Sequence, residues 1–389
     1  MNDDDRDPWS VTEQDLYESM RSFRDEETDA VLATVVDVEG SAYRRPGAKM
    51  LVAPGQESLG AITAGCLEGP VNDLAADVLD AGEPIVHTFD LMDDEGWGLG
   101  LGCNGIIDIL LEPLDAGWET VLEELDAGRP VARTTVVGVD DAASGGAVAV
   151  GDRIVTDATG DHLSAASRGG LPQSVLEAVA DERERLRPRG GAGTVTVETE
   201  DGTIEVFVEW LTPAPDLLLF GTQNDVHPVA RIGHEAGFRV VIASARGARS
   251  DPEQFPHAHA VRTTKPTDVA EVVDVPERTY AVIMSHNAIE DRLALASLLD
   301  TDVPYVGLMG PRDRFEDLRA DMATEDDREL TDDELERIAT PVGLDLGGGE
   351  PTQIAISIVA EALAVHNDRD GGRLKERKGP IHTRVAPSE

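Results

Sequence analysis

The sequence predicts an α/β protein in which a mixed α+β amino-terminal domain is followed by a Rossmann-like, doubly wound parallel sheet. Up to residue 212, apolar runs of strand length are mixed with amphipathic helices and with hairpins that have Asp-Gly or Gly-Asp turns. After the proline-containing segment 212–215, strands alternate regularly with helices, as in βαβ units. The 389 residues are enough for two such domains, each with its own core.

We predict four parts along the chain. Residues 1–27 form a tail and a first helix, and residues 28–212 form the amino-terminal domain. Residues 213–367 form the Rossmann-like domain, and residues 368–389 form a carboxy-terminal tail. The boundary is placed at the segment 212–215 because the pattern of strands and helices changes there.

The composition is strongly acidic, with a formal net charge of −43 and a pI near 4.3. An acidic surface of this kind, with few lysines, is typical of halophilic proteins, in which salt screens the self-repulsion. It argues against binding to nucleic acid or to an anionic membrane. Because there is no long apolar stretch and the first residues are acidic, we expect a cytoplasmic protein. The two cysteines, Cys66 and Cys103, are too few for a disulfide framework and are expected to be reduced.

Apolar spacing predicts the elements of the amino-terminal domain. Helices are expected at residues 11–23, 68–81, 118–125 and 171–186, and strands at residues 30–38, 58–63, 84–91 and 106–112. The runs 129–155 and 193–210 alternate with period two around Asp-Gly or Gly-Asp turns, which predicts antiparallel hairpins. We expect these hairpins to complete the sheet of the first domain.

In the second half, strands and helices alternate. Strands are expected at residues 216–220, 238–243, 260–261, 280–284 and 305–309, and helices from residue 226, up to residue 299, from residue 312 and over residues 351–366. Ligands of such folds bind at the carboxyl ends of the strands. The loops that contain His286, Gly310 and residues 343–347 should therefore face the same edge as Gly221. His286 could act there as an acid, a base or a metal ligand, or it could simply pack at a helix start.

The first turn of this domain departs from the dinucleotide fingerprint. Gly221 fits the first glycine, but Gln223 and Val226 occupy the second and third positions. Ser244 ends the second strand, where an acidic residue would bind a ribose hydroxyl. The pattern therefore argues against tight NAD(P) binding.

Cys66 lies in the turn between the strand at 58–63 and the helix at 68–81. Unpaired backbone N–H groups and the helix dipole would stabilise negative charge on its sulfur, and Gly65 lets a ligand approach the backbone. Such a cysteine could be a nucleophile, a soft metal ligand or an anchor for sulfur chemistry. The alternative is a small buried apolar residue.

Two further segments could complete a pocket around this sulfur. Residues 39–50 contain Ser41 and three cations, Arg44, Arg45 and Lys49, which together could bind an anion or a phosphate. The alternative is that these cations neutralise acidic neighbours. The glycine-rich residues 96–105 form a tight loop that contains Gly102 and Cys103, and two cysteines in glycine-rich turns predict a shared pocket, unless both are unrelated buried residues. The other histidines show no metal-ligand spacing and no Ser/His/Asp triad, so no catalytic residue is predicted.

Several motifs resemble the XdhC/CoxI family of accessory proteins for molybdenum hydroxylases. In the first half these are VEGSAYRRPGAKM (residues 38–50), AGCLEG (64–69) and WGLGLGCNG (97–105). In the second half they are SHN followed by EDR (285–292), YVGLMGPR (305–312), VGLDLGGGEPTQIA (342–355) and GPIH (379–382). The resemblance extends from about residue 28 to residue 383.

The resemblance implies a cofactor chaperone. Such a protein binds the molybdenum pterin cofactor (molybdopterin), receives it with its terminal sulfur and delivers it to an apo molybdenum hydroxylase of the xanthine or carbon monoxide dehydrogenase type. Cys66 matches the cofactor-binding cysteine of the family, and a thiolate is a suitable ligand for molybdenum. A cysteine desulfurase is a further expected partner. A homodimer is compatible with this role, although no interface is visible in the sequence.

The cofactor-binding residues predicted from these patterns and from the resemblance are Ser41, Arg44, Arg45, Lys49, Gly65, Cys66, Glu68, Gly102, Cys103, Gly221, His286 and Gly310. The basic residues would contact the phosphate of the pterin, and the Cys103 loop would form the opposite wall. The alternative function is an NAD(P)-dependent oxidoreductase that uses the Rossmann-like domain. A hydroxylase subunit is disfavoured because the chain lacks cysteine clusters for iron–sulfur centres.

Overall fold

The computed structural model describes residues 8–40, 42–91, 105–140, 148–199, 202–245 and 251–377. The chain divides after Pro213 into two compact units. Each unit contains both helices and strands, and each has its own hydrophobic clusters. The predicted class, a mixed α+β part followed by a Rossmann-like part, is confirmed.

The first unit contains a five-stranded sheet in the order β3-β2-β1-β5-β4, with all neighbours antiparallel. Its strands are β1 (Val31–Gly40), β2 (Lys49–Val52), β3 (Leu59–Gly60), β4 (Ile85–Asp90) and β5 (Gly105–Pro113). The central strand β1 is fully buried from Val31 to Val36, as its nearly continuous apolar run predicts. The strand predicted at 58–63 is much shorter, because only Leu59 and Gly60 pair with β2.

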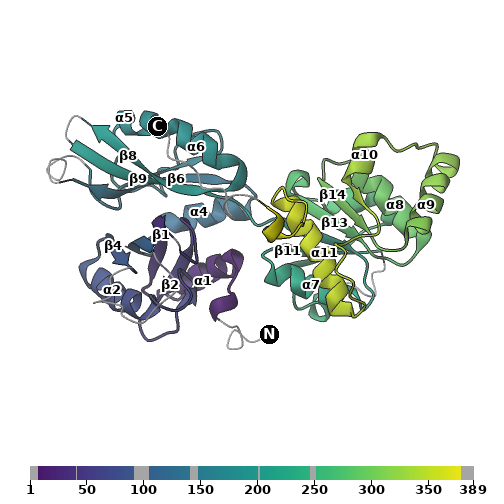
Figure 1. Ribbon diagram of the computed structural model, residues 1–389, viewed down its shortest axis with the longest axis horizontal. Coiled ribbons are helices and arrows are strands. Elements are labelled where there is room, and N and C mark those ends of the chain that lie inside the picture. The colour runs from purple at the N-terminus through teal and green to yellow at the C-terminus, as the bar shows by residue number, and fades with distance from the viewer. Residues whose placement is uncertain are drawn as a thin grey trace. The chain divides into compact units, whose positions relative to one another are not determined.

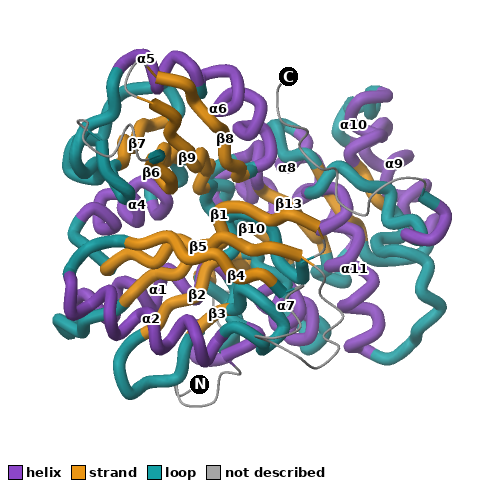
Figure 2. Tube along the Cα trace, turned by 60° about the vertical axis from the view of Figure 1, so that its left-hand side comes forward, coloured by secondary structure: helices purple, strands orange, loops and turns teal. Residues whose placement is uncertain are grey.

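In the described part of the first unit, three helices, purple in Figure 2, pack against this sheet. They are α1 (Glu13–Asp25), α2 (Glu68–Ala81) and α4 (Gly117–Asp126). α2 buries Val71, Ala75 and Val78 against one face, and these positions have the helical spacing of the sequence. α1 and α4 belong to the cluster on the other face, where Trp118 and Met20 are buried.

The hairpins of the first unit do not extend this sheet, so that prediction is wrong. β6 (Val131–Val139), β7 (Arg153–Asp157), β8 (Ala192–Thr199) and β9 (Gly202–Leu211) form a separate four-stranded antiparallel sheet in the order β7-β6-β9-β8. Residues from both sheets meet in a small apolar cluster that contains Val36, Leu110 and Phe207. Period-two patterning identifies the buried face of a strand but not the strand with which it pairs.

Two short helices cover the far face of the second sheet. They are α5 (Gln173–Ala178) and α6 (Ala180–Leu186), where the sequence predicted one helix over 171–186. The break is at Val179, whose φ of −94° and ψ of 1° leave the α-helical range. Val179 itself is buried in the cluster that packs against the sheet.

The second unit is a six-stranded, all-parallel sheet in the order β12-β11-β10-β13-β14-β15. Numbered from its first strand this order is 3-2-1-4-5-6, which is the Rossmann order. The strands are β10 (Asp216–Phe220), β11 (Arg239–Ser244), β12 (Ala260–Thr263), β13 (Thr279–Ile283), β14 (Tyr305–Leu308) and β15 (Ile338–Ala339). The strand order reverses between β10 and β13, so the loops after these two strands flank the usual ligand position.

Helices cover both faces of the parallel sheet (Figure 1). They are α7 (Val226–Glu235), α8 (Ala288–Leu299), α9 (Arg312–Glu325), α10 (Asp332–Arg337) and α11 (Pro351–His366). α7 and α11 pack in the cluster on one face, and α8 and α9 pack in the cluster on the other. Among the described helices none has both the length and the apolar character needed to cross a lipid bilayer.

Candidate functional site

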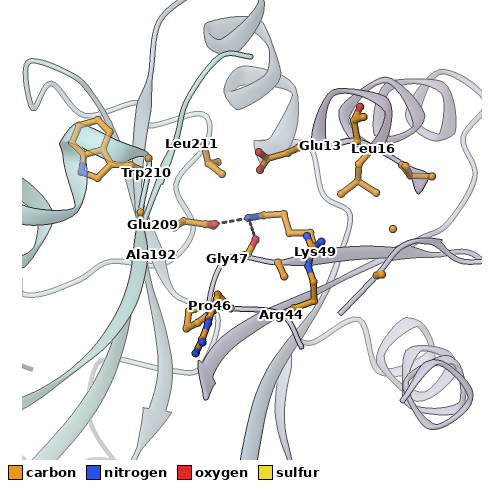
Figure 3. Close-up of a pocket in the computed structure, with 18 of the residues that line it drawn as sticks. Glu13, Leu16, Arg44, Pro46, Gly47, Lys49, Ala192, Glu209, Trp210 and Leu211 are labelled. Atoms are coloured by element: carbon orange, nitrogen blue, oxygen red, sulfur yellow. Dashed lines mark hydrogen bonds and ion pairs between the residues drawn. The ribbon is translucent and has the colours of Figure 1, made fainter. Parts of the chain in front are cut away.

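The first unit contains an open cavity of about 430 Å³. Its walls come from the amino-terminal segment with α1, from the loop before β2, and from the ends of β8 and β9. Arg44, Arg45 and Lys49 all line it, so the structure brings the three predicted cations to one place (Figure 3). The volume lies in the range of small-molecule sites.

Hydrogen bonds to β1 hold the basic loop in position. The amide of Gly47 donates to the carbonyl of Val35 over 2.8 Å, and the amide of Val35 donates to the carbonyl of Ala48 over 2.9 Å. Gly47 has a φ of +96°, which favours glycine, and a Cβ there would lie 3.2 Å from the Cβ of Ala192 on β8. The loop therefore has a defined backbone, and Arg44 and Arg45 are exposed at its tip.

Lys49 differs from the two arginines because it is buried and paired. Its Nζ lies 2.5 Å from Oε2 of Glu209 on β9 and donates to the carbonyl of Gly47 over 3.1 Å (Figure 3). The side chains of Lys49 and Glu209 are only 3% and 2% exposed. The expectation that Lys49 offers a free charge to a phosphate is therefore corrected, since its charge is already neutralised by Glu209.

This pair is one end of a buried ionic network between the two sheets. Arg133 on β6 donates to both oxygens of Glu112 over 2.7 Å and to Glu209 over 3.1 Å, and its guanidinium lies 4.5 Å from the Trp118 ring centroid. Burial alone would lower the pKa of Arg133, but the Glu112 and Glu209 carboxylates outweigh burial and raise it. Burial would raise the pKa of Glu209, but Lys49 and Arg133 outweigh it and lower that pKa. The network thus supports one wall of the cavity with fixed charges.

The guanidinium groups of Arg44 and Arg45 have no hydrogen bond or ion pair with any residue in the described parts of the chain. The chain has a net charge of −43, yet neither guanidinium group is paired with an acid of the described residues. They therefore provide the positive charge that remains available to an anion in the cavity.

The segment from Gly60 to Glu68 runs from the cavity to Cys66, which does not itself line the cavity and packs partly against the cluster that contains α2. Gly60 and Ala61 line the cavity, and Cys66 is a free, partly exposed cysteine just before α2. Gly65 has a φ of +109°, and a Cβ at that position would lie 3.4 Å from the ring of Trp9, which also lines the cavity. Trp9 thus lies beside Gly65 of the cysteine loop and also lines the cavity.

Side-chain hydrogen bonds fix the conformation of the cysteine loop. The buried Thr63 hydroxyl accepts from the Leu67 amide over 3.3 Å and donates to Glu68 Oε1 over 3.1 Å. The Leu67 amide also donates to Glu68 Oε2 over 3.1 Å. Glu68 therefore stabilises the loop, and the Leu67 amide at the helix start is not one of the unpaired N–H groups expected near the sulfur.

Gly221 and His286 of the second unit lie where the strand order predicts, after β10 and β13. His286 has a φ of 59°, uncommon for a residue with a side chain, and its Nε2 lies 2.6 Å from Oδ2 of Asp225. Asn287 caps α8 by accepting from the amides of Ile289 and Glu290. Gly310 follows β14 with a φ of +131°. His286 is thus held by Asp225 next to a capped helix start.

The space at this edge of the second unit is small. The described residues around Gly221, Gln223 and Ser285 enclose about 10 Å³, which is room for about one water molecule. Buried Asp291 accepts from the Ser285 hydroxyl over 2.5 Å and pairs with Arg314, and burial raises the pKa of its carboxyl. No space of dinucleotide size is enclosed by these described residues.

Comparisons with known proteins match both units. The sequence model of a family described as the XdhC and CoxI family matches residues 23–90. The sequence model of a family described as the XdhC Rossmann domain matches residues 217–362. The chain belongs to the XdhC/CoxI family.

Three known proteins resemble this family member. A probable xanthine dehydrogenase subunit of Bacillus subtilis (strain 168) is 27% identical over 354 residues, which cover 90% of this chain and 96% of the relative. Uncharacterized protein YqeB of Escherichia coli (strain K12) is 26% identical over 210 residues, or 53% of this chain and 38% of that protein. A crystal structure described as a xanthine dehydrogenase from Bacillus halodurans has a TM-score of 0.71 and 25% identity, and the match covers 94% of this chain and 98% of that chain.

Several wall residues of this XdhC/CoxI family member were not predicted from the sequence, among them Trp9, Glu13 and Glu209. Glu209, which follows the apolar residues 206–208 of β9, was a usable signal, because a charge in a buried strand requires a partner. Trp9 and Glu13 gave no signal, since a tail residue and an acid in a first helical turn are ordinary. Ser41, Gly102 and Cys103 lie outside the described residues.

Proposed function

We propose that this protein is an accessory protein of a xanthine dehydrogenase-type molybdenum hydroxylase that binds the molybdenum pterin cofactor and delivers its sulfurated form. Membership of the XdhC/CoxI family and the similarity to a probable xanthine dehydrogenase subunit of Bacillus subtilis support the accessory role. Under this proposal the cofactor is the cargo of the protein, its client is an apo molybdenum hydroxylase, and a cysteine desulfurase would supply the sulfur.

The observation that carries the cofactor-binding part is the cavity of the first unit. Its lining includes two guanidinium groups that have no partner among the described residues, an exposed tryptophan and an exposed tyrosine. Gly60, Ala61 and Trp9, which line the cavity, lie next to the loop of a partly exposed cysteine. Arg44 and Arg45 would bind the phosphate of the pterin, and aromatic faces would contact its ring. The thiolate of Cys66 is a soft ligand suited to molybdenum.

The proposal is tested by the cofactor content of purified protein. We expect the wild-type protein, produced in a host with an intact molybdenum pathway, to contain molybdenum and pterin in comparable amounts, and Cys66→Ser to lose most of both. Ala64→Ser is the matched control, because it adds a hydroxyl to an exposed position of the same loop and keeps the sulfur. Far-ultraviolet circular dichroism checks that both variants fold. Equal cofactor content in Cys66→Ser and wild type would contradict the role of Cys66.

A second candidate is an NAD(P)-dependent oxidoreductase, favoured by the Rossmann strand order and by the His286–Asp225 pair at the point where that order reverses. It requires saturable binding of NAD or NADP, with a dissociation constant in the micromolar to millimolar range. Calorimetric titration of the full chain with each dinucleotide at high salt measures this. Heat that does not saturate with either dinucleotide would remove the candidate.

A further inference from the structure

The charged groups on the cavity wall differ in whether they have partners. Lys49 and Glu209 neutralise each other at 2.5 Å. Arg44, Arg45 and Glu13 form no ion pair with the described parts of the chain, so their charges can act on a ligand. A ligand that matches this wall has an anionic group at one end and hydrogen-bond donors at the other.

Glu13 is held in a defined orientation. It lies in the first turn of α1, where a capping box between Thr12 and Asp15 fixes the start of the helix. Its carboxylate is directed into the cavity (Figure 3), and its Oε1 accepts a hydrogen bond of 2.7 Å from the hydroxyl of Tyr17, one turn along the helix. Burial and the neighbouring Glu13 raise the pKa of Tyr17 well above its ordinary value, so Tyr17 remains a donor at neutral pH. The carboxylate keeps unused acceptor positions on both oxygens.

Two exposed aromatic side chains give the cavity flat apolar surfaces. Trp9 is 47% exposed and Tyr43 is 66% exposed, and both line the cavity. Exposed aromatic rings in a concave site are suited to stacking on a planar heterocycle. A planar ring stacked on such a face would leave its edge free for side chains of the same cavity, which include Glu13.

We propose that Glu13 recognises the 2-amino-4-oxopyrimidine edge of a phosphorylated heterocycle bound in this cavity. This edge carries a ring N–H beside an exocyclic amino group, and the two parallel donors match the two oxygens of a carboxylate. Arg44 and Arg45 take the phosphate. The inference rests on the proposed function. It specifies the edge of the pterin that is recognised and the residue that recognises it.

Pterins and guanine nucleotides share this edge, so the experiment uses both. The probes are neopterin monophosphate, GMP and IMP, each titrated into the full chain at high salt by calorimetry. IMP differs from GMP only in lacking the 2-amino group. We expect neopterin monophosphate to bind more tightly than GMP, and GMP to bind about tenfold more tightly than IMP, because IMP lacks one hydrogen bond to a charged group. If GMP binds more tightly than neopterin monophosphate, the ligand that Glu13 recognises is a guanine nucleotide and not a pterin.

Glu13→Gln should reduce the preference for GMP over IMP to less than about threefold, because one carboxylate acceptor becomes a donor. Glu18→Gln is the matched control, since Glu18 is an exposed acid of the same helix that does not line the cavity. It should keep the full preference.

The outcomes separate this inference from the proposed function. Equal affinities for GMP and IMP in the wild type, or the same preference in Glu13→Gln as in wild type, would overturn the role of Glu13. The proposed function would then still be judged by the molybdenum and pterin content of Cys66→Ser. If none of the three probes binds, the inference is also overturned, because the proposed recognition does not require the metal.

Discussion

The three cations between positions 44 and 49 differ in their partners. Lys49 is buried against Glu209, which lies 160 residues further along the chain, whereas Arg44 and Arg45 have exposed side chains that are unpaired within the described residues. A buried lysine in an ion pair stabilises the fold, and an exposed arginine on a fixed loop can bind an anion. The same short segment therefore serves both structure and binding.

Arg44→Glu should weaken the binding of phosphorylated ligands by about tenfold to a hundredfold, because it removes one charge-assisted hydrogen bond and adds a repulsive charge. The measurement is the dissociation constant of neopterin monophosphate at a fixed salt concentration. Arg319→Glu is the control, since Arg319 is an exposed arginine of α9, in the other unit, whose side chain pairs with no described residue. An unchanged dissociation constant for Arg44→Glu would assign the residue to surface electrostatics.

The turn after β10 depends on a single glycine. Gly221 has a φ of +154°, and a Cβ there would lie 2.5 Å from the carbonyl oxygen of Met284 at the end of β13. The positive φ and the close Met284 carbonyl are both backbone features, so a side-chain rotation cannot relieve the strain that a Cβ would cause. The close approach of the β10 turn to β13 therefore explains the glycine at this position without a dinucleotide.

Gly221→Ala should lower the free energy of unfolding by about 2–4 kcal/mol, combining steric overlap with an unfavourable φ. Gly237→Ala is the control, because Gly237 has a φ of +90° but no described atom within 4 Å of the added Cβ. It should cost only about 1–2 kcal/mol. Urea denaturation at high salt, monitored by far-ultraviolet circular dichroism, measures the free energy of unfolding of both variants. Equal losses of stability would show that the overlap with the Met284 carbonyl does not add to the cost.

The ionic network between β2, β5, β6 and β9 gives a test of stability and of its pH dependence. Glu209→Ala should lower the free energy of unfolding by about 3–5 kcal/mol, because Lys49 and Arg133 lose a buried partner. The pKa of Glu209 is lowered in the folded state, so its contribution is complete above the unfolded pKa of about 4.3 and is lost as the pH falls through the folded pKa. The difference between wild type and Glu209→Ala should therefore be constant from pH 7 to about pH 5.

Glu205→Ala, on the same strand, is the matched control. Glu205 is an exposed side chain whose pKa is raised by partial burial, Asp108 and Asp37, so its ionised form opposes folding. Its removal should leave the free energy of unfolding at pH 7 unchanged or slightly higher. Equal losses in the two variants would show that the network adds nothing beyond packing.

For the molecule as a whole, the sequence predicted local elements well and distant partners poorly. The helix at 68–81 has the predicted bounds because spacing and flanking glycines are local signals, and the parallel sheet of the second unit agrees with the β–α alternation of the sequence. The second sheet and the Lys49–Glu209 pair depend on which strands meet, and that is decided by packing over long chain separations. The cavity could be predicted only in part for the same reason: its basic loop is one segment, but its acidic and aromatic walls come from others.

Because the net charge is −43, the stability of the fold should depend on the salt concentration. On α9 and α10 most acids are exposed, and they include Asp313, Glu316, Asp317, Asp321, Glu325, Asp332, Asp333 and Glu336. Such charges repel one another within each unit, and the repulsion weakens as the Debye length falls from about 10 Å at 0.1 M to about 3 Å at 1 M salt.

We therefore expect the Tm to rise by at least about 10 °C between 0.1 M and 2 M KCl, since each kcal/mol shifts the Tm of a domain of this size by about 2–4 °C. Sucrose at matched osmolality is the control, because it strengthens burial without screening charge, and it should raise the Tm less. The loss of stability in Glu209→Ala should be the same at both salt concentrations, because the Lys49–Glu209 pair is shielded from solvent ions. A Tm that does not change with KCl, or that rises equally in sucrose, would contradict adaptation of this surface to salt.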